Sequence, residues 1–454
     1  MNQRSNFTSK IGFVLAAAGS AVGLGNLWRF PYLAAQYGGG TFLLVYLILA
    51  VTFGFALMVA EIAIGRKTGL SAIGAYKALD KRFGFVGILT SLVPIIILPY
   101  YSVIGGWVTK YVYTFLSGSA VAAADDAFFG NFIGNSPIEP IGWFFLYFAL
   151  TAIIVLFGVE KGIEKVSKIM MPVLVVLTLG ISVYVVTRPG ALDGVLYYIK
   201  PSIKNFSFKT ILAAMGQLFY SMSLAMGIMI TYGSYMKKEN HLEGSVRQIE
   251  LFDTGIAFLA GLMIVPSAFT YYNGSVEKMG KGPTLMFEVL PKVFNDMPGI
   301  MGTVIGATFF ILVFFAALTS SISLMETVVS IVMDKTKWNR KITCVVVAIF
   351  TLLMGIPSSL GFNIWSHIKP LGQDLLTFFD FTSNSVIMPI VAFFTCILVG
   401  FVIKPKAVID EVKVTDGTFK SEKLFTVMIK WIAPICILGI LAFSIAEGMG
   451  WIRV

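Results

Sequence analysis

Polar residues interrupt the first apolar stretch of the chain, and their types suit the binding of small charged solutes. Residues 19–31 read Gly-Ser-Ala-Val-Gly-Leu-Gly-Asn-Leu-Trp-Arg-Phe-Pro, so glycines, Asn26 and Arg29 fall within a hydrophobic segment. Glycine in a helix interior costs about 1 kcal/mol relative to alanine. We therefore expect two half-helices joined by an unwound hinge, whose carbonyls can hold a cation and whose N–H groups can hold an anion. A glycine-rich packing face is the simpler interpretation, but packing does not require Asn26 and Arg29.

A second apolar stretch carries the same kind of interruption. Residues 216–235 read Gly-Gln-Leu-Phe-Tyr-Ser-Met-Ser-Leu-Ala-Met-Gly-Ile-Met-Ile-Thr-Tyr-Gly-Ser-Tyr, which places Gln217, Ser221, Ser223 and Gly227 in mid-span. Serines in a membrane helix usually bond to the carbonyl one turn back, so this stretch alone would indicate packing. Interrupted helices at corresponding positions of two halves indicate instead a transporter of inverted repeats, with its site near the middle of the bilayer.

The rest of the chain supplies the helices that position these residues. Its 454 residues are 57% hydrophobic and 13% charged, which is typical of a polytopic membrane protein. Apolar stretches of about 20 residues, enough to span a bilayer, fall at 11–36, 41–65, 86–116, 141–158, 169–187, 210–236, 251–272, 299–333, 342–358, 377–402 and 425–447. We expect an all-α fold of two inverted five-helix repeats, in which helices 1 and 6 are broken, plus an eleventh helix.

The positive charges assign the two faces of the membrane. About two-thirds of the Lys and Arg residues fall in the loops and termini of one face, so the positive-inside rule makes that face, with the N-terminus, cytoplasmic. The net charge of +10 is therefore explained by topology, and no nucleic-acid partner is expected. The expected divisions are a cytoplasmic N-terminal segment with an inner gate (1–10), the first repeat (11–187), an extracellular loop (188–209), the second repeat (210–402), a cytoplasmic loop (403–424) and the eleventh helix with an extracellular C-terminus (425–454).

Residues that usually form disulfides or metal centres are sparse. Cys344, Cys396 and Cys436 all fall in apolar spans, and His241 and His367 lie far apart in predicted loops. We expect neither a disulfide framework nor a metal centre of histidines or cysteines. The sequence shows no paired nucleophile and base, so an enzyme is the least favoured class.

The interrupted stretches resemble one protein family. The segments Ala21-Val-Gly-Leu-Gly-Asn-Leu-Trp-Arg-Phe-Pro31, Gly216-Gln-Leu-Phe-Tyr-Ser-Met-Ser-Leu224 and Ala316-Ala-Leu-Thr-Ser-Ser-Ile322 are similar to the neurotransmitter:sodium symporters, specifically to their bacterial eleven-helix amino-acid transporters. The resemblance covers roughly residues 4 to 402. It implies a sodium-coupled symporter of the bacterial inner membrane that imports hydrophobic or aromatic L-amino acids by alternating access.

The resemblance implies a substrate site at both interruptions. Its residues would be Ala21, Gly23, Leu24, Gly25, Ile97, Tyr101, Tyr220, Ser221, Ser223, Met226, Ser320, Ser321 and Leu324. The N–H groups of Leu24 and Gly25 and the Tyr101 hydroxyl would bind the substrate carboxylate, and three carbonyls would accept from its ammonium (Ala21, Tyr220 and Ser221). Transporters of decarboxylated amines carry aspartate at the position of Gly23, so glycine favours an amino acid. The pocket has no charged side chain, and the flexible Met226 suits several hydrophobic substrates.

Two sodium sites follow from the same resemblance, because sodium prefers oxygen ligands. The first site would use the substrate carboxylate with Ala21, Asn26, Ser221 and Asp253, and the second would use Gly19, Val22, Ala316, Thr319 and Ser320. The shared carboxylate would couple ion and substrate binding. Asp253 replaces the asparagine of a bacterial relative, and its negative charge should make chloride unnecessary.

Gates and a hinge complete the assignment that the resemblance implies. Arg29 and Asp380 would form the outer gate with Gln217 nearby, while Tyr101 and Tyr220 close over the substrate. Arg4 and Asp334 would form the inner gate with Tyr235 and Ser234, and ordinary cytoplasmic charge is the alternative for this pair. Gly162 and Pro172, ten residues apart, would let the fifth helix unwind, although Pro172 alone could simply kink it.

Other functions on this scaffold stay open at this point. The chain could carry another small amino-acid-like solute, or it could be an ion-conducting channel or an amino-acid-gated sensor. A proton-coupled carrier of similar helix plan would lack the hydroxyl-rich second ion site, so Thr319 and Ser320 argue against it. The sequence contains no indication of the oligomeric state.

Overall fold

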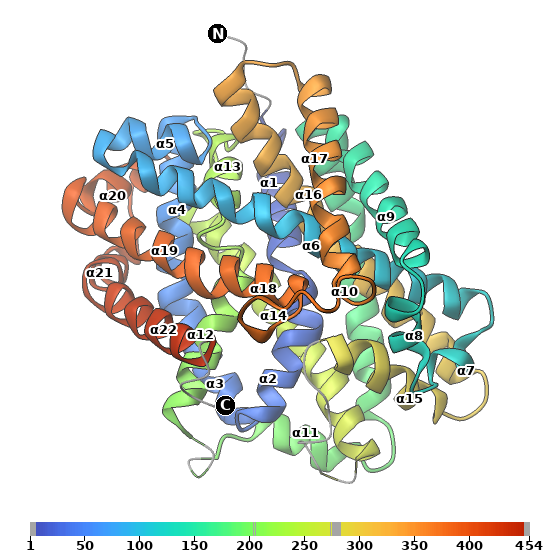
Figure 1. Ribbon diagram of the computed structural model, residues 1–454. Helices are drawn as coiled ribbons and strands as arrows, with labels where there is room; N and C mark the ends of the chain where they lie inside the picture. Colours follow the sequence, from blue (N-terminus) through green and yellow to red (C-terminus); the bar gives the residue numbers. More distant parts are fainter. Residues whose placement is uncertain (1–5, 203, 205, 273, 275–282, 449–454) are drawn as a thin grey trace.

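The protein is built of membrane-spanning helices. The computed structural model describes residues 6–202, 204, 206–272, 274 and 283–448, and all regular secondary structure in these ranges is helical (Figure 1). Within them, nine helical stretches are long and apolar enough to cross a membrane, at Gly40–Thr68, Lys81–Leu116, Ile138–Leu156, Val159–Val186, Leu242–Tyr271, Met301–Thr336, Arg340–Leu360, Leu375–Val402 and Glu422–Ala446. The pair Lys10–Ala21 and Gly25–Gln36, bent by 51°, forms a tenth span. Two shorter helices around residues 222–227 occupy the position of the predicted sixth span, so the eleven predicted stretches all correspond to helices.

The helices of the first half follow the predicted order. The spans consist of α1 (Lys10–Ala21), η1 (Gly25–Arg29) and α2 (Phe30–Gln36), then α3 (Gly40–Leu49), η2 (Ala50–Gly54) and α4 (Phe55–Thr68), then α6 (Gly84–Leu116), α9 (Ile138–Leu156), and η4 (Val159–Glu164) with α10 (Lys165–Val186). Between them lie α5 (Ala72–Leu79), η3 (Lys81–Phe83), α7 (Ala120–Ala123) and α8 (Phe128–Gly134). The π-helical segments η1, η2 and η4 show that three of these spans depart from regular α-helix.

The second half repeats this plan and adds a last span. Its spans consist of α12 (Phe208–Ser221) and α13 (Ile228–Ser234), then α14 (Leu242–Tyr271), α16 (Met301–Thr336), α17 (Arg340–Leu360), then α18 (Leu375–Asp380), η9 (Phe381–Ile387), α19 (Met388–Ile397) and η10 (Leu398–Val402), and finally α21 (Glu422–Val427), η11 (Met428–Ile432) and α22 (Ala433–Gly448). The expected loops 188–209 and 403–424 contain helices of their own, α11 (Ala191–Ile199) and α20 (Lys406–Asp416). The connection before α16 contains η7 (Leu285–Val289) and α15 (Leu290–Asn295), and η8 (Pro370–Gly372) precedes α18.

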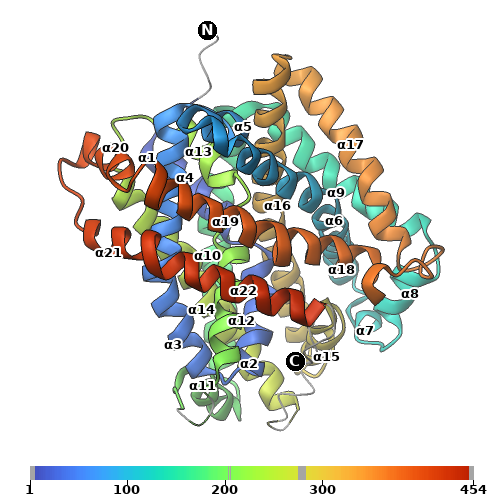
Figure 2. The same ribbon diagram turned by 60° about the vertical axis from the view of Figure 1, so that its left-hand side comes forward.

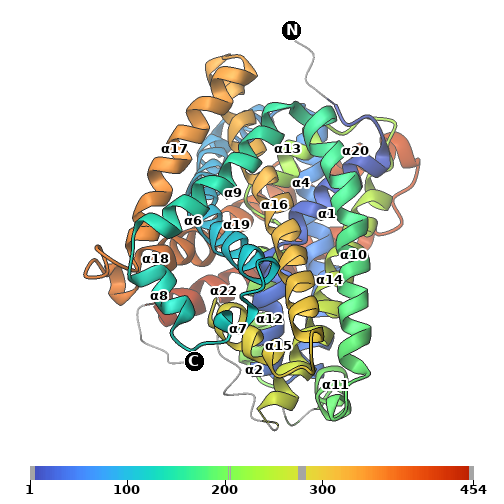
Figure 3. The same ribbon diagram turned by 90° about the vertical axis from the view of Figure 1, so that its right-hand side faces the viewer.

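Helix α1 lies at the centre of the molecule. It packs against α10, α14 and α16, and the views from the front and the side both show it enclosed by these helices (Figures 1 and 3). The last span lies at the periphery, where α22 runs beside α19 (Figure 2). A helix in the middle of a bundle can carry polar breaks, because neighbouring protein and not lipid then surrounds its unpaired backbone groups.

Glycines bring α4 and α13 into direct backbone contact. A Cβ atom on Gly65 would lie 1.9 Å from the carbonyl oxygen of Ile230, and one on Gly233 would lie 2.4 Å from that of Ile62. Small residues allow this approach between membrane helices. Helix α13, the second half of the broken sixth span, is thereby held against α4.

Candidate functional site

The first span breaks directly after α1. Val22 has φ −76° and ψ 93°, so the chain leaves the helix there and resumes a helical path at Leu24. The Leu24 N–H donates to the Tyr101 hydroxyl at 3.3 Å. A Cβ on Gly23 would lie 2.6 Å from Ser320 Oγ, and one on Gly25 would lie 2.5 Å from the ring of Tyr220. Glycine at these two positions therefore leaves room for tyrosine and serine side chains to approach the break.

The sixth span breaks over residues 222–227. Ser223 and Ala225 have φ values of 52° and 60°, which residues other than glycine rarely adopt, and Gly227 has a φ of 73°. The Ala225 N–H donates to the buried Glu61 carboxylate at 2.7 Å, so α4 stabilises the unwound backbone. Gln217 joins the two breaks, because its side-chain N–H donates to the Gly25 carbonyl at 2.9 Å.

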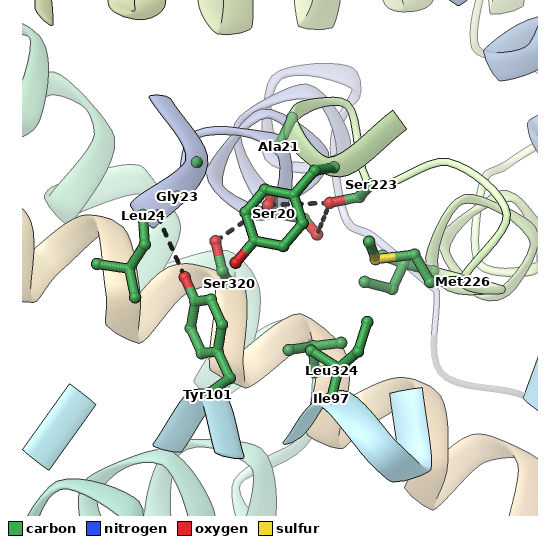
Figure 4. Close-up of a pocket in the computed structure, with 13 residues that line it drawn as sticks. Ser20, Ala21, Gly23, Leu24, Ile97, Tyr101, Ser223, Met226, Ser320 and Leu324 are labelled. Carbon is green, nitrogen blue, oxygen red and sulfur yellow. Dashed lines mark hydrogen bonds between the residues drawn. The ribbon is translucent and has the colours of Figure 1, made fainter. Parts of the chain in front are cut away.

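The two breaks and two neighbouring helices enclose a cavity of about 30 Å³ (Figure 4). Its lining contains all but two of the predicted substrate contacts, namely Ala21, Gly23, Leu24, Gly25, Ile97, Tyr101, Tyr220, Ser223, Met226, Ser320 and Leu324, together with Ser20 and Ile228. This volume suffices for one or two waters. The walls must separate for an amino-acid side chain to enter, and the flexible Met226 can move most easily.

The two predicted contacts that do not line the cavity face other parts of the molecule. Ser221 belongs to the polar cluster around Asp253 described below. Ser321 differs from the expectation, because its hydroxyl bonds to Tyr147 at 3.0 Å and Thr151 at 2.9 Å on α9. One residue along a helix rotates the side chain by about 100°, which turns Ser321 away from the face that Ser320 presents.

Sequence reasoning missed Ser20 and Ile228. Ser20 Oγ lies 3.1 Å from Ser223 Oγ, and the Ser20 carbonyl accepts from Ser223 and Ser320, each at 3.0 Å (Figure 4). This single carbonyl thus connects α1, the second break and α16. The signal in the sequence was the position of Ser20 between Gly19 and Ala21, both of which had been assigned to the site.

A buried carboxylate lies beside the cavity. Asp253 on α14 is 0% exposed and accepts hydrogen bonds from Asn26 at 2.8 Å, Ser221 at 2.7 Å and Tyr46 at 3.1 Å. The structure therefore brings together the three side chains predicted for the first sodium site, and it adds Tyr46. These partners are all neutral. A buried charge without a counter-charge is costly, and a bound cation would remove that cost.

Four of the five residues predicted for the second sodium site also meet. The Ser320 hydroxyl on α16 donates to the Gly19 carbonyl on α1 at 3.4 Å, and a Cβ on Gly19 would lie 3.2 Å from Thr319 Cβ. The Thr319 hydroxyl donates to the Ala316 carbonyl at 3.1 Å, and Val22 is fully buried at the end of α1. Carbonyl and hydroxyl oxygens from two helices suit a hard cation such as sodium.

Transition-metal chemistry receives no support from the described residues. Among them, no group of three or more His, Cys, Asp or Glu side chains converges on one point.

The predicted outer gate is arranged differently from the expectation. Arg29 donates to the Gly216 carbonyl at 3.3 Å and lies 5.5 Å from the Tyr220 ring, whereas Asp380 accepts from Tyr100 at 3.0 Å. Arg29 and Asp380 form no ion pair with each other in this conformation, and both line a cavity of about 280 Å³ to which Tyr220 also contributes.

The residues predicted for the inner gate contact several side chains that sequence reasoning did not name. Arg4 lies outside the described residues, and Asp334 accepts from the N–H and the hydroxyl of Ser71 at 2.9 and 2.6 Å. The Tyr235 hydroxyl donates to Glu326 at 2.8 Å, and the same buried carboxylate forms an ion pair with Arg340.

Three other predicted residues, Ser234, Gly162 and Pro172, belong to the predicted inner gate and hinge. The Ser234 hydroxyl donates to the Thr231 carbonyl within α13 at 2.6 Å. Gly162 lies in η4, where a Cβ would be 2.1 Å from the Ile154 carbonyl oxygen, and Pro172 lies inside α10. The fifth span is therefore irregular at the predicted hinge, and its movement stays a prediction.

Two broken spans that enclose a cavity beside buried oxygen clusters define a membrane transporter with a central binding site. The family model of the sodium:neurotransmitter symporters matches residues 4–123 and 139–450, so the chain belongs to this family. It is therefore a multi-pass, sodium-dependent membrane transporter and not an enzyme.

Several relatives support the same assignment. The chain is 33% identical over 455 residues to the sodium-dependent transporter YhdH of Bacillus subtilis, which covers 96% of this chain and 98% of the relative. It is 34% identical over 456 residues to a sodium-dependent transporter of Haemophilus influenzae, with 96% and 97% covered. A crystal structure of MhsT in complex with L-phenylalanine superposes with a TM-score of 0.87 at 36% identity, and the match covers 97% of this chain and all of MhsT. The fold with a broken first span is thereby confirmed.

Proposed function

We propose that the protein is a symporter that uses the sodium gradient to import hydrophobic or aromatic L-amino acids by alternating access. The observation that carries the proposal is the placement of the Asp253 cluster beside a cavity lined by both broken spans. Asn26 belongs to the cluster and follows directly on Gly25 in the cavity wall. An ion and a solute bound at these two places would touch, which is the requirement for coupled transport.

An amino acid fits the polar groups of the cavity. The Tyr101 hydroxyl and the Leu24 N–H lie together at the first break, where they can bind a carboxylate, and backbone carbonyls of the breaks can accept from an ammonium. The cavity lining contains no charged side chain, so a zwitterion with an apolar side chain is favoured. MhsT, which has the same fold, was crystallised with L-phenylalanine, in keeping with a hydrophobic substrate here.

We further propose two sodium ions and no requirement for chloride. The first ion would lie at Asn26, Ser221, Asp253 and the Ala21 carbonyl, and the second between Gly19, Val22, Ala316, Thr319 and Ser320. Because Asp253 already supplies a buried negative charge, an additional anion would repel it. The proposed orientation places the N-terminus in the cytoplasm and the C-terminus outside a bacterial inner membrane.

Uptake into proteoliposomes tests the proposed function. The vesicles receive one radiolabelled amino acid at a time under an inward gradient of sodium, potassium or choline chloride. The panel contains leucine, methionine, phenylalanine, tyrosine and tryptophan, with glutamate and lysine for comparison. We expect saturable uptake of the hydrophobic amino acids only with sodium, and unchanged uptake when gluconate replaces chloride. Equal uptake in potassium, or a conductance that does not saturate, would contradict the proposal. The Tyr101→Phe variant removes one hydroxyl from the cavity and should raise the substrate KM without loss of the protein from the membrane.

A further inference from the structure

A buried carboxylate holds the cytoplasmic end of α1. Glu164, at the last position of η4, is 1% exposed, and its oxygens accept from the Thr8 N–H at 2.8 Å, the Thr8 hydroxyl at 2.5 Å and the Ser9 hydroxyl at 3.1 Å. Lys168, one turn further along α10, completes the set at 2.7 Å. Residues more than 150 positions apart in the sequence are thus joined by one side chain.

The start of α1 is shaped to receive this carboxylate. Ser9 is the N-cap of α1, and its hydroxyl accepts from the Gly12 N–H at 3.0 Å. A Cβ on Gly12 would lie 2.0 Å from Glu164 Oε1, so only glycine admits the side chain at this distance. The N-terminal end of a helix carries a partial positive charge, which favours a carboxylate there.

The same short segment is anchored on its other side. The Phe7 N–H donates to the Tyr235 carbonyl at 3.2 Å, and the Phe7 ring packs edge-on against Phe13, Tyr232 and Tyr235. Residues 7–9 therefore connect α13, the inner half of the sixth span, with the start of the fifth. We call residues 7–9 and Glu164 the clasp.

Movement of α1 would affect the proposed second sodium site. The opposite end of α1 carries the Gly19 carbonyl, which meets the Ser320 hydroxyl on α16. The clasp lies at one end of this 12-residue helix and the ion ligands at the other. A rotation of α1 away from α10 and α16 must break the hydrogen bonds of Glu164 and separate the ion ligands together.

We propose that Glu164 is a positioning residue of the transport cycle, which keeps the cytoplasmic half of α1 closed and must release Thr8 and Ser9 when the cytoplasmic side opens. The proposal rests on the proposed function, because it assigns the opening to sodium release. Lys168, four residues further along the chain, lies 2.7 Å from the carboxylate and would supply a positive charge to it after release. The location of Glu164 two residues after Gly162 lets unwinding of η4 withdraw the carboxylate from α1.

Hydrogen–deuterium exchange of the purified full-length protein in nanodiscs tests the clasp without transport. In potassium buffer free of amino acid, Glu164→Gln should speed exchange of peptides covering Thr8 to Gly12 by about tenfold, because a neutral amide accepts more weakly than a carboxylate. The control Glu160→Gln removes an exposed carboxylate from the same π-helical segment and should leave exchange unchanged. Unchanged exchange in Glu164→Gln, or equal acceleration over all helices, would overturn the proposal.

Sodium titration then links the clasp to the ion site. Glu164→Gln should raise the sodium concentration that half-saturates stabilisation by about tenfold, while saturating sodium restores slow exchange at Thr8, as linkage requires. Sodium affinity equal to that of Glu160→Gln would refute the coupling. Should Glu164→Gln fail to fold, Thr8→Val and Ser9→Ala remove donors from the other side of the clasp and must produce the same two changes. If exchange at Thr8 to Gly12 is faster in Glu164→Gln but sodium has no effect on it, the result would contradict the proposed function. It would still demonstrate the contact of Glu164 with Thr8 and Ser9.

Discussion

Replacement of Asp253 by asparagine separates the charge of the proposed sodium site from its shape. The amide oxygen of the Asp253→Asn variant can still accept from Asn26 and Ser221, which now share Oδ1. The new amide N–H₂ can donate to the Tyr46 hydroxyl, which at present donates to Oδ2. Asn26 also keeps its bond to the backbone carbonyl of residue 253 at 3.1 Å. The hydrogen bonds therefore survive with one reversal, and the substitution removes mainly one negative charge.

The size of the effect follows from the burial of that charge. Two unit charges about 4 Å apart attract by about 4 kcal/mol at an effective dielectric constant of about 20. Some attraction persists because the amide oxygen still coordinates the cation, so we expect a loss of about 3 to 4 kcal/mol, or a 10²- to 10³-fold weaker affinity for sodium. Without sodium, the variant should be as stable as the parent or more stable, because Asp253 is 0% exposed and its partners are neutral.

Thermal unfolding against sodium concentration measures both effects. A ligand at 100 times its Kd stabilises a protein by about 2.7 kcal/mol, so the parent Tm should rise with sodium while that of Asp253→Asn stays nearly constant. Tyr46→Phe is the control, since it removes one hydrogen bond from the carboxylate and keeps the charge. A half-saturating sodium concentration in Asp253→Asn within threefold of the parent would refute the assignment of Asp253 to a cation site.

Three further predictions address stability, packing and anion dependence. Glu411→Gln should lower the free energy of unfolding by about 3 to 5 kcal/mol, because the side chain of its partner Arg66 is 0% exposed. The control Glu422→Gln breaks only an exposed pair with Lys413 and should lower it by about 0 to 1 kcal/mol. Denaturant or thermal unfolding measures both changes. Gly65→Ala should reduce the folded yield in the membrane, because the added methyl would lie 1.9 Å from the Ile230 carbonyl oxygen, and detergent-solubilised protein that elutes and melts like the parent would contradict this. Exchange of chloride for gluconate should leave initial uptake rates within the error of the assay, and a rate that rises with chloride would show that the charge of Asp253 does not suffice.

Local composition was enough to predict a helical membrane protein with two interrupted spans, whereas the residues of the cavity were implied by the family resemblance. Asn26 and Arg29 in an apolar span would destabilise the protein in the bilayer unless they face a polar cavity. Together with the neighbouring glycines they therefore located the first break. At both breaks, backbone N–H and C=O groups lose their partners within the helix and can contact a bound solute. The eleven cavity residues shared by prediction and structure lie in or directly beside the two breaks, or one turn apart on α6 and on α16.

The contacts that sequence reasoning missed depend on tertiary packing. Tyr46 reaches Asp253 from more than 200 positions away, and nothing around it in the sequence is polar. Sequence reasoning also missed the contacts of Glu164, because a charged residue at the predicted cytoplasmic end of a helix is common and does not indicate a partner. The gate pair of Arg29 and Asp380 stays a prediction: family resemblance identifies which charges can meet, whereas the conformation decides whether they do. In this conformation both residues line a cavity of about 280 Å³.

The placement of α1 connects the proposed ion sites at one end of the helix with the contact to Glu164 at the other. Its C-terminal end supplies carbonyls to the cavity and to both proposed ion sites, and its N-terminal end is held by Glu164. A rigid helix of 12 residues transmits displacement from one end to the other without bending. If ions bind at the proposed sites, their binding must favour the state in which the Glu164 end of α1 is closed, and opening of that end must weaken ion binding by an equal free energy. At the proposed ion sites, movement of α1 would withdraw the Gly19 carbonyl from the second site and the Ala21 carbonyl from the first. The first site would keep the contact between Asp253 and Ser221, because these residues lie on α14 and α12, whereas the second would lose one of the two helices that form it.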